Sequence, residues 1–441
     1  MVAPVRATAL PVRSLGGPLL VALFLAGAVP PSVAAQEGYE EEMRSLLDDD
    51  AIQRAFEYIE ASDSRTLQDQ IELTEIPAPP FGEEERAREF LSRMQALGVD
   101  EGWIDEEGNA IALRRGSVGD EVVAISGHLD TVFPDGTDVT VRTRGDTLFA
   151  PGISDDGRGL ATVLAVLRAL NEAEVETRSD LLFIGTVGEE GIGDLRGVKH
   201  LFSEAGSRID AFISVDGANP RGITHQALGS HRYRVTFLGP GGHSWGAFGL
   251  VNPAHALGRA IGHLDDLADR FTQEGPRSSY NVGRIGGGTS VNSIPYESWM
   301  EVDLRSEEQW ALLALDSLFH EAMERAEWEA NQVRRRGDLL TVEVEMIGSR
   351  PSGEIAPSDP FIQRAIAATR ALGMEPTLGR SSTDSNVPIA LGIPSMTIGG
   401  GGASGRAHSP DEWFLNRDGP RGIQRALLIM VAQAGLASEG D

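Results

Sequence analysis

Residues 122–130 read Val-Val-Ala-Ile-Ser-Gly-His-Leu-Asp, and this stretch decides the fold class. It opens with a short run of mostly apolar and β-branched side chains, which predicts a buried strand. The strand then runs into two polar side chains, His128 and Asp130. In open α/β sheets, ligands collect beyond the carboxyl ends of the strands. We therefore expect His128 and Asp130 to lie at a functional edge of a sheet.

The same pattern repeats on both sides of this strand, because apolar runs alternate with segments of helical periodicity. Strands are expected at 110–113, 148–150, 181–187, 211–215 and 395–398, and helices at 160–170, 195–202, 361–372 and 423–434. Before them, residues 39–97 have the apolar spacing of amphipathic helices. Apolar strands separated by helices predict an α/β fold, with a mostly parallel sheet and helices on both faces.

The order of elements changes between residues 228 and 346. A strand, a helix, two strands, a long helix and a last strand are expected there, which is the order of a small split βαβ unit. After residue 346 the first pattern resumes. We therefore predict a catalytic domain made of residues 36–227 and 347–441, interrupted by an inserted α+β domain at 228–346.

The first 35 residues have the order of a signal peptide. Arg6 and Arg13 come first, an apolar stretch follows at 19–29, and small residues lead up to Ala35. The apolar stretch is about half as long as the roughly 20 residues that span a bilayer, which disfavours a membrane anchor. We expect cleavage near Ala35 and export to the periplasm or the medium, with no membrane association of the mature chain.

Composition excludes several classes of function. The chain of 441 residues has 38 basic and 66 acidic side chains, so its formal net charge is −28. A nucleic acid would be repelled by this charge, and we expect none as a partner. The sequence contains no cysteine, which excludes disulfides, thiolate metal sites and cysteine nucleophiles. Any bound metal must therefore be held by His, Asp and Glu.

Further His, Asp and Glu residues follow the other expected strands or open an expected helix. They are Asp155, Glu189, Glu190, Asp216 and His408. Carboxylates gathered at one sheet edge would repel one another and raise their own pKa values, a cost that a dication relieves. With no thiols, these ligands suit zinc, with manganese or cobalt as alternatives. Their number exceeds the needs of one ion and favours two ions that share a carboxylate.

Five motifs, taken in order, resemble the co-catalytic zinc exopeptidases and deacylases of the M20 type. They are SGHLDTV at 126–132, GISDDGRG at 152–159, GEEG at 188–191, VDG at 215–217 and HSPDE at 408–412. The resemblance runs from about residue 73 to the C-terminus. It departs from many family members at Gly157, where they have a lysine.

The resemblance implies two zinc ions and a role for each residue of the predicted site. Asp155 would bridge the ions, His128 and Asp216 would complete one site, and Glu190 and His408 would complete the other. Asp130 would orient the imidazole of His128. Glu189 would be the general base that takes a proton from the attacking water.

The resemblance also implies residues of the inserted domain that act on the substrate. His243, in the run Gly-Gly-His-Ser, would stabilise the oxyanion, in many family members from the partner subunit. Asn292 and Arg305 would hold the substrate, since an arginine can bind a carboxylate through two hydrogen bonds. The inserted domain would then serve as a lid and a dimerisation domain, and the protein would be a homodimer.

We predict an exopeptidase that acts on short peptides, with an N-acyl amino acid deacylase of the same mechanism as the alternative. A serine hydrolase is a second alternative, because Ser244 lies in a G-x-S-x-G run and is followed by Asp384 and His408. A Gly-Pro-Gly-Gly loop precedes Ser244 in place of a strand, which disfavours this reading. A binding protein without turnover is a third alternative, but it would not need Glu189.

Overall fold

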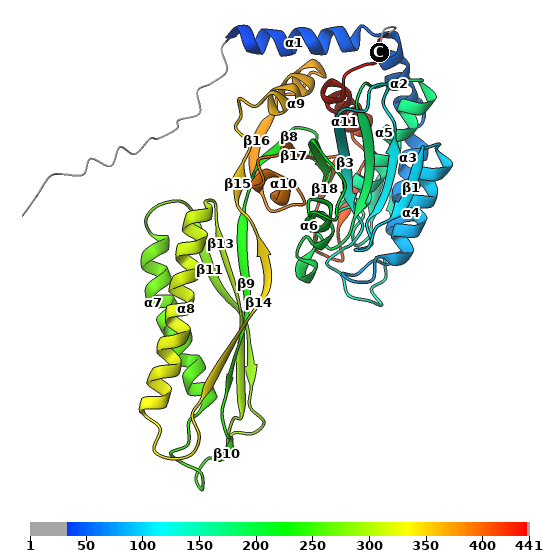
Figure 1. The fold of residues 1–441 in the computed structure, drawn as a ribbon. Helices are drawn as coiled ribbons and strands as arrows, with labels where there is room; N and C mark the ends of the chain where they lie inside the picture. The colour runs from blue at the N-terminus through cyan, green and yellow to red at the C-terminus, as the bar shows by residue number, and fades with distance from the viewer. Residues whose placement is uncertain (1–32, 439–441) are drawn as a thin grey trace, which may run out of the picture.

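The computed structural model describes residues 33–438, which form two units, each built on its own sheet (Figure 1). The larger unit contains a nine-stranded sheet in the order β1-β2-β6-β3-β7-β17-β8-β15, with β16 paired to β8. Its strands are β1 (Glu101–Ile104), β2 (Ala110–Arg114), β3 (Val122–His128), β6 (Asp180–Thr186), β7 (Ala211–Val215), β8 (Gly222–Ala227), β15 (Gly353–Glu354), β16 (Thr377–Ser381) and β17 (Ser395–Ile398).

The centre of this sheet is parallel. Strands β6, β3, β7 and β17 are parallel neighbours, whereas β2 and β8 flank them in the antiparallel sense. Every residue of β7 and β17 is buried, as expected for strands that are covered on both faces. The predicted α/β fold with a mostly parallel sheet and helices is confirmed.

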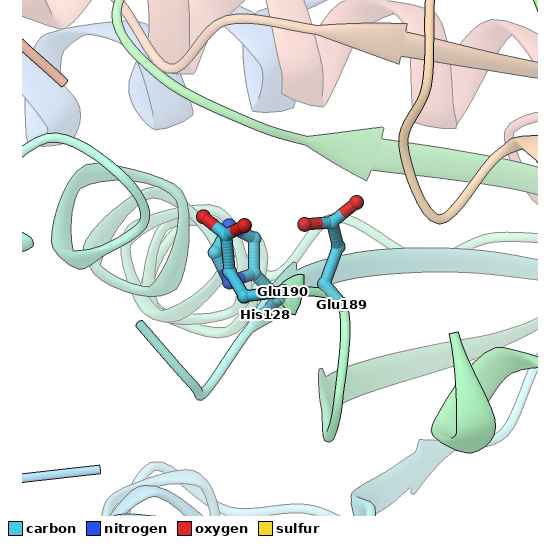
Figure 2. A group of neighbouring side chains, drawn as sticks. All are labelled: His128, Glu189 and Glu190. Carbon is cyan, nitrogen blue, oxygen red and sulfur yellow. The ribbon is translucent and has the colours of Figure 1, made fainter. Parts of the chain in front are cut away.

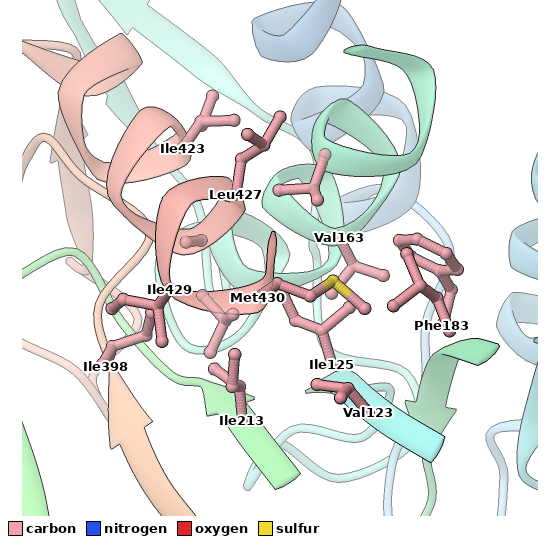
Figure 3. Packing of buried hydrophobic residues seen from close by; sticks show 14 of the residues in the cluster. Val123, Ile125, Val163, Phe183, Ile213, Ile398, Ile423, Leu427, Ile429 and Met430 are labelled. Carbon is pink, nitrogen blue, oxygen red and sulfur yellow. The ribbon is translucent and has the colours of Figure 1, made fainter. Parts of the chain in front are cut away.

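Helices cover both faces of the sheet because alternate strand residues point to opposite sides. Val123 and Ile125 of β3 and Ile213 of β7 lie on the side of α11, where Leu427 and Met430 pack (Figure 3). The residues between them, such as Ala124, pack with α6. The helices of this unit are α1 (Val33–Leu47), α2 (Asp50–Ala61), α3 (Asp63–Thr74), α4 (Glu84–Ala96), α5 (Gly157–Glu172), α6 (Arg196–Leu201), α9 (Pro360–Ala371), α10 (Asn386–Ala390) and α11 (Gly419–Ala434).

One predicted strand belongs elsewhere. The apolar run at 148–150 was expected in the main sheet, but it forms part of a small antiparallel sheet in the order β18-β19-β5-β4. Only Leu148 of its strand is buried, and it packs with Phe414. A strand at the centre of a sheet that is covered by helices on both faces needs several consecutive buried residues, and this strand has only one. The bounds are β4 (Arg142–Arg144), β5 (Thr147–Phe149), β18 (Ala403–Gly405) and β19 (Trp413–Leu415).

The second unit is a four-stranded antiparallel sheet in the order β11-β13-β9-β14, with two helices on one face (Figure 1). Its core is formed by apolar residues of the helices and of the sheet face that they cover. A short ribbon of β10 and β12 lies at the end farthest from the main sheet. The elements are β9 (Gly229–Leu238), β10 (Gly242–His243), α7 (Pro253–Thr272), β11 (Ser278–Gly287), β12 (Ser293–Ile294), β13 (Glu297–Ser306), α8 (Gln309–Gln332) and β14 (Thr341–Arg350).

The chain crosses between the units twice, and one side chain joins the two crossings. The Nδ2 of Asn386 donates to the carbonyl oxygen of Leu228 at 2.9 Å and to that of Pro351 at 3.1 Å. Among residues 33–438, none of the helices is long and apolar enough to cross a bilayer. The predicted signal peptide lies outside the described residues, apart from its last three residues, with which α1 begins.

Candidate active site

The predicted site residues lie at the carboxyl ends of three parallel strands. His128 is the last residue of β3, Glu189 and Glu190 follow β6, and Asp216 follows β7. Parallel neighbours end at the same edge of a sheet, so these side chains meet there. Figure 2 shows Glu190 with the His128 ring and the carboxylate of Glu189 beside them.

Asp155 lies between two imidazoles. Its Oδ1 is 2.9 Å from Nε2 of His128, and its Oδ2 is 3.1 Å from Nε2 of His408. The same nitrogen of His408 is 2.9 Å from Oε1 of Glu190. Each oxygen of Asp155 thus faces a different histidine, so this carboxylate could offer one oxygen to each of two cations.

Three overlapping groups could hold metal ions. They are His128 with Glu189 and Glu190; His128 with Asp156 and Asp216; and Asp155 with Glu190 and His408, and the atoms of each group lie within 4.8 Å of one another. The third group contains the residues predicted for one of the two ions. In the second group the partner of His128 and Asp216 is Asp156, which the sequence analysis did not single out.

The electrostatics of the cluster fit bound cations. Burial raises the pKa of Asp216, and the nearby charge of Asp155 raises it further. Burial likewise raises the pKa of Glu189 and of Asp156 well above the usual range. Hydrogen bonds with Asp155 and Glu190 raise the pKa of His408 to about 10. Buried carboxylates that repel one another beside two imidazoles form a donor set of oxygen and nitrogen that suits dications such as zinc.

Asp130 connects His128 to the loop that carries the two glutamates. Its carboxylate accepts hydrogen bonds from the backbone N–H groups of Glu189, at 3.0 Å, and Glu190, at 2.7 Å. The Nδ1 of His128 lies 3.0 Å from the carbonyl oxygen of Asp130 and 3.6 Å from its Oδ1. Burial alone would raise the pKa of Asp130, but its interactions with His128 and with these amides lower it. Asp130 is therefore an ionised acceptor that fixes its neighbours.

Two carboxylates that the sequence analysis gave no role hold the backbone of the site. Glu412 accepts from the amides of Gly152, Ser154 and Asp155, at 2.8–3.1 Å. Asp156 caps α5 and accepts from the amide of His128 at 3.0 Å. Asp156 and Glu412 both belong to the sequence motifs named above. Their hydrogen-bond partners, however, come together only when the turn before α5 is folded.

Arg350 is a third residue that the sequence analysis missed. It is the last residue of β14, and its Nη1 lies 3.1 Å from Oε1 of Glu189 and 3.1 Å from Oγ of Ser382. Its Nη2 also donates to the carbonyl oxygen of Glu189. Arg350 follows Glu189 by 161 residues and lies in the other unit. No local sequence pattern points to this pair.

The structure does not bring every predicted residue to the cluster. His243 on β10 and Asn292 lie together, since the amide of Ser244 donates to the carbonyl oxygen of Asn292 at 2.8 Å. Both are exposed at the far end of the second unit (Figure 1). Arg305 lies on β13, and its Nε donates to Asp303 at 2.7 Å. Within one chain, neither His243 nor Asn292 reaches the cluster.

The same placement separates the residues of the serine-hydrolase alternative. Ser244 lies beside β10, whereas His408 contacts Asp155 and Glu190 in the larger unit. Asp384 is also in the larger unit, where Oγ1 of Thr186 donates to it at 2.5 Å. The three residues do not meet within the chain, so they form no triad there.

The α/β sheet carries at its strand ends a His/carboxylate cluster that could hold metal ions. A family model described as peptidase family M20/M25/M40 matches residues 124–431, and the chain belongs to this family. The resemblance that the five motifs indicated is confirmed.

Individual proteins are also similar to this chain in sequence or in fold. An acetylornithine deacetylase of Salmonella arizonae is 26% identical over 306 residues, which are 66% of this chain and 75% of that protein. The aminopeptidase PepT of Bacillus cereus has a similar fold, with a TM-score of 0.67, 22% identity, and coverage of 84% of this chain and 99% of that one. The YXEP protein of Bacillus subtilis, a dinuclear metal-binding peptidase of family M20, matches with a TM-score of 0.61, 19% identity, and coverage of 85% and 99%.

Proposed function

We propose that this protein is a two-metal exopeptidase that hydrolyses amide bonds of short peptides. The observation that carries the proposal is the position of Asp155 between His128 and His408, with Glu190 beside the second histidine. In this proposal Asp155 would hold both of two ions, for which zinc is preferred and manganese or cobalt are alternatives. His128 and Asp216 would complete one site, and Glu190 and His408 would complete the other.

The remaining residues act on protons and on the substrate. Metal ions held by this cluster would lower the pKa of a bound water and polarise the scissile carbonyl. Glu189 accepts the proton of the attacking water at a carboxylate oxygen and later donates it to the leaving amine. Asp130 orients His128 through Nδ1. His243 donates to the oxyanion, and Asn292 and Arg305 hold the substrate.

The position of His243 supports a homodimer. Since His243 and Asn292 lie at the far end of their own chain, they complete the cluster of a second copy in this proposal. The inserted domain, predicted at 228–346 and extending in the structure to Arg350 at the end of β14, then serves as lid and dimerisation domain between the two catalytic parts. We further propose that the signal peptide is cleaved near Ala35 and that the mature protein works in the periplasm or outside the cell.

The test of the mechanism is the Glu189→Gln variant. Removing a general base costs roughly 10²–10⁴ in turnover, and the neutral amide cannot accept the proton. We expect loss of peptidase activity with the metal content unchanged, measured by kinetics and by elemental analysis of the same sample. The exposed Glu204→Gln is the matched control. Near-normal activity of Glu189→Gln would show that Glu189 is not the general base.

An N-acyl amino acid deacylase of the same mechanism is the second candidate, and the similarity to an acetylornithine deacetylase supports it. A library of dipeptides, tripeptides and N-acyl amino acids, digested with and without chelator and followed by mass spectrometry, separates the two. Chelator-sensitive release of amino acids from peptides favours the exopeptidase. Turnover of N-acyl amino acids alone favours the deacylase, and metal binding without any turnover favours a binding protein.

A further inference from the structure

The loop that carries Glu189 and Glu190 lies at the joint between the two units, where the chain crosses from one unit to the other. It covers residues 187–195, between the end of β6 and the start of α6. Asp130 holds the first half of this loop from the main unit, through the backbone amides of both glutamates. The second half of the loop contacts the second unit, and the proposed mechanism does not use these contacts.

Asp194 binds a backbone amide of the second unit. Its Oδ1 accepts a hydrogen bond from the amide of Ser349, on β14, at 2.8 Å, and its Oδ2 lies 2.5 Å from Nζ of Lys199. Arg232 of β9 makes another contact, since its Nη1 donates to the carbonyl oxygen of Gly191 at 2.8 Å. Two neighbouring strands of the second unit, β9 and β14, thus hold the loop.

The backbone of β14 allows this close contact. The register between β14 and β9 shifts between Met346 and Gly348, as in a β-bulge, and bulges re-aim strands next to active sites. A Cβ atom at Gly348 would lie 3.2 Å from Oδ1 of Asp194 and 3.2 Å from Cδ of Arg232. Both distances are shorter than an ordinary van der Waals contact. The strand can therefore approach Asp194 because residue 348 has no side chain.

The loop has a strained backbone at the same place. Asp194 and Leu195 have φ angles of 52° and 59°, in the left-handed region that residues other than glycine seldom adopt. Such conformations persist only where surrounding contacts impose them. Two backbone hydrogen bonds join this part of the loop to the part with the glutamates. The amide of Leu195 donates to Gly188 at 2.7 Å, and the amide of Gly193 donates to Glu190 at 2.8 Å.

We propose that Asp194 is a positioning residue, which links the orientation of the second unit to the position of Glu189 and Glu190. The loop is held from both units at once, by Asp130 on one side and by Asp194 on the other. A rotation of the second unit therefore changes the orientation of the proposed base. The expected effect on turnover rests on the proposed function, whereas the link between the units does not.

The test compares three variants of the full metal-loaded protein. Asp194→Ala removes the acceptor, and Asp194→Asn keeps an oxygen acceptor but loses the charge that faces Lys199. Asp418→Ala is the matched control, because Asp418 is exposed, has a φ angle of 55° and makes no capping hydrogen bond with its side chain. The control therefore measures the effect of placing alanine in the left-handed region.

Turnover should separate these variants, because a displacement of about 1 Å can cost roughly 100-fold in rate. We expect kcat of Asp194→Ala to fall by roughly 10–100-fold, with KM and metal content close to those of the wild type. Asp194→Asn and Asp418→Ala should turn over like the wild type. The proposal is wrong if Asp194→Ala turns over normally. It is also wrong if Asp194→Asn is impaired as strongly, because the ion pair with Lys199 would then be the cause.

Hydrogen exchange gives a second readout, which needs no catalysis. In Asp194→Ala, the peptides that contain Ser349 and residues 187–195 should both exchange about tenfold faster, the effect of losing one hydrogen bond to a charged group. Asp194→Asn and Asp418→Ala should exchange there like the wild type. Unchanged exchange at Ser349 in Asp194→Ala would overturn the link between the units. Faster exchange in that variant, together with a wild type that hydrolyses no amide, would support the link and refute the proposed function.

Discussion

Asp155 offers one carboxylate oxygen to each of two imidazoles, and its environment keeps it ionised. Burial alone would raise its pKa, but the hydrogen bonds with His128 and His408 lower it far below the usual range. The neighbouring Asp156 and Asp216 respond in the opposite direction, because burial raises their pKa values. One charged carboxylate at the centre of the cluster is what a shared ligand of two cations requires.

The Asp155→Asn variant tests this role. An amide keeps the shape of the side chain but replaces one oxygen with a nitrogen that does not bind a cation. We expect elemental analysis to find at most one metal ion per chain, together with loss of activity. Asp146→Asn makes the same chemical change at an exposed position and should keep two ions. Two ions in both variants would contradict the bridging role.

The ion pair of Arg350 predicts a pH effect. Burial raises the pKa of Glu189, and the positive charge of Arg350 opposes that rise. In Arg350→Met the opposing charge is lost, so the pKa of Glu189 rises further and the base loses its proton only at higher pH. We expect the acidic limb of the kcat/KM profile to move upward by roughly one pH unit or more. An unmoved limb would show that Arg350 does not act on the base.

At the scale of an element, the turn before α5 depends on Glu412. This carboxylate accepts three backbone amides of the turn, including the amide of Asp155. Burial raises the pKa of Glu412 to about 7, and the nearby charge of Asp155 contributes to the rise. Glu412 therefore orders the segment that presents Asp155, although it is more than two hundred and fifty residues away in sequence.

The Glu412→Ala variant should loosen this turn. Partners behind metal ligands typically contribute 10–100-fold to metal affinity, and we expect a loss of that size in a competition titration with a coloured chelator. Asp411→Ala, next to it and exposed, is the matched control. If the two variants bind metal with equal affinity, Glu412 does not stabilise the metal site.

The elements that the sequence predicts correctly are those whose residues are mostly apolar and buried. Strands β7 and β17 contain only apolar residues and small serine or threonine side chains, all of them buried, and their predicted bounds agree with the structure. Strand β8 was missed because its buried Ile223, His225 and Ala227 alternate with polar residues over only six positions. The contact of Arg350 with Glu189 could not be predicted, since it depends on how the second unit returns to the first.

At the scale of the whole molecule, the chain places its proposed oxyanion donor far from its own metal cluster. His243 is exposed on β10, at the end of the second unit, while the cluster lies at the edge of the main sheet (Figure 1). Two arrangements could bring a His243 to the cluster: a rotation of the second unit about the joint within one chain, or the His243 of a second chain. Only in the second arrangement do two subunits contribute residues to each active site.

Mixing two inactive variants distinguishes these cases. Glu189→Gln lacks the base, and His243→Ala lacks the donor, so each homodimer is impaired. If His243 serves the partner, every mixed dimer contains one site with an intact Glu189 and an intact His243. Random pairing of equal amounts makes half of the dimers mixed, and activity should recover to about a quarter of the wild-type value.

Glu189→Gln mixed with Asp155→Asn is the control and should recover nothing, because both defects then lie in the cluster. Recovery at the level of that control would show that His243 acts within its own chain, and the joint between the units would then have to close during each turnover.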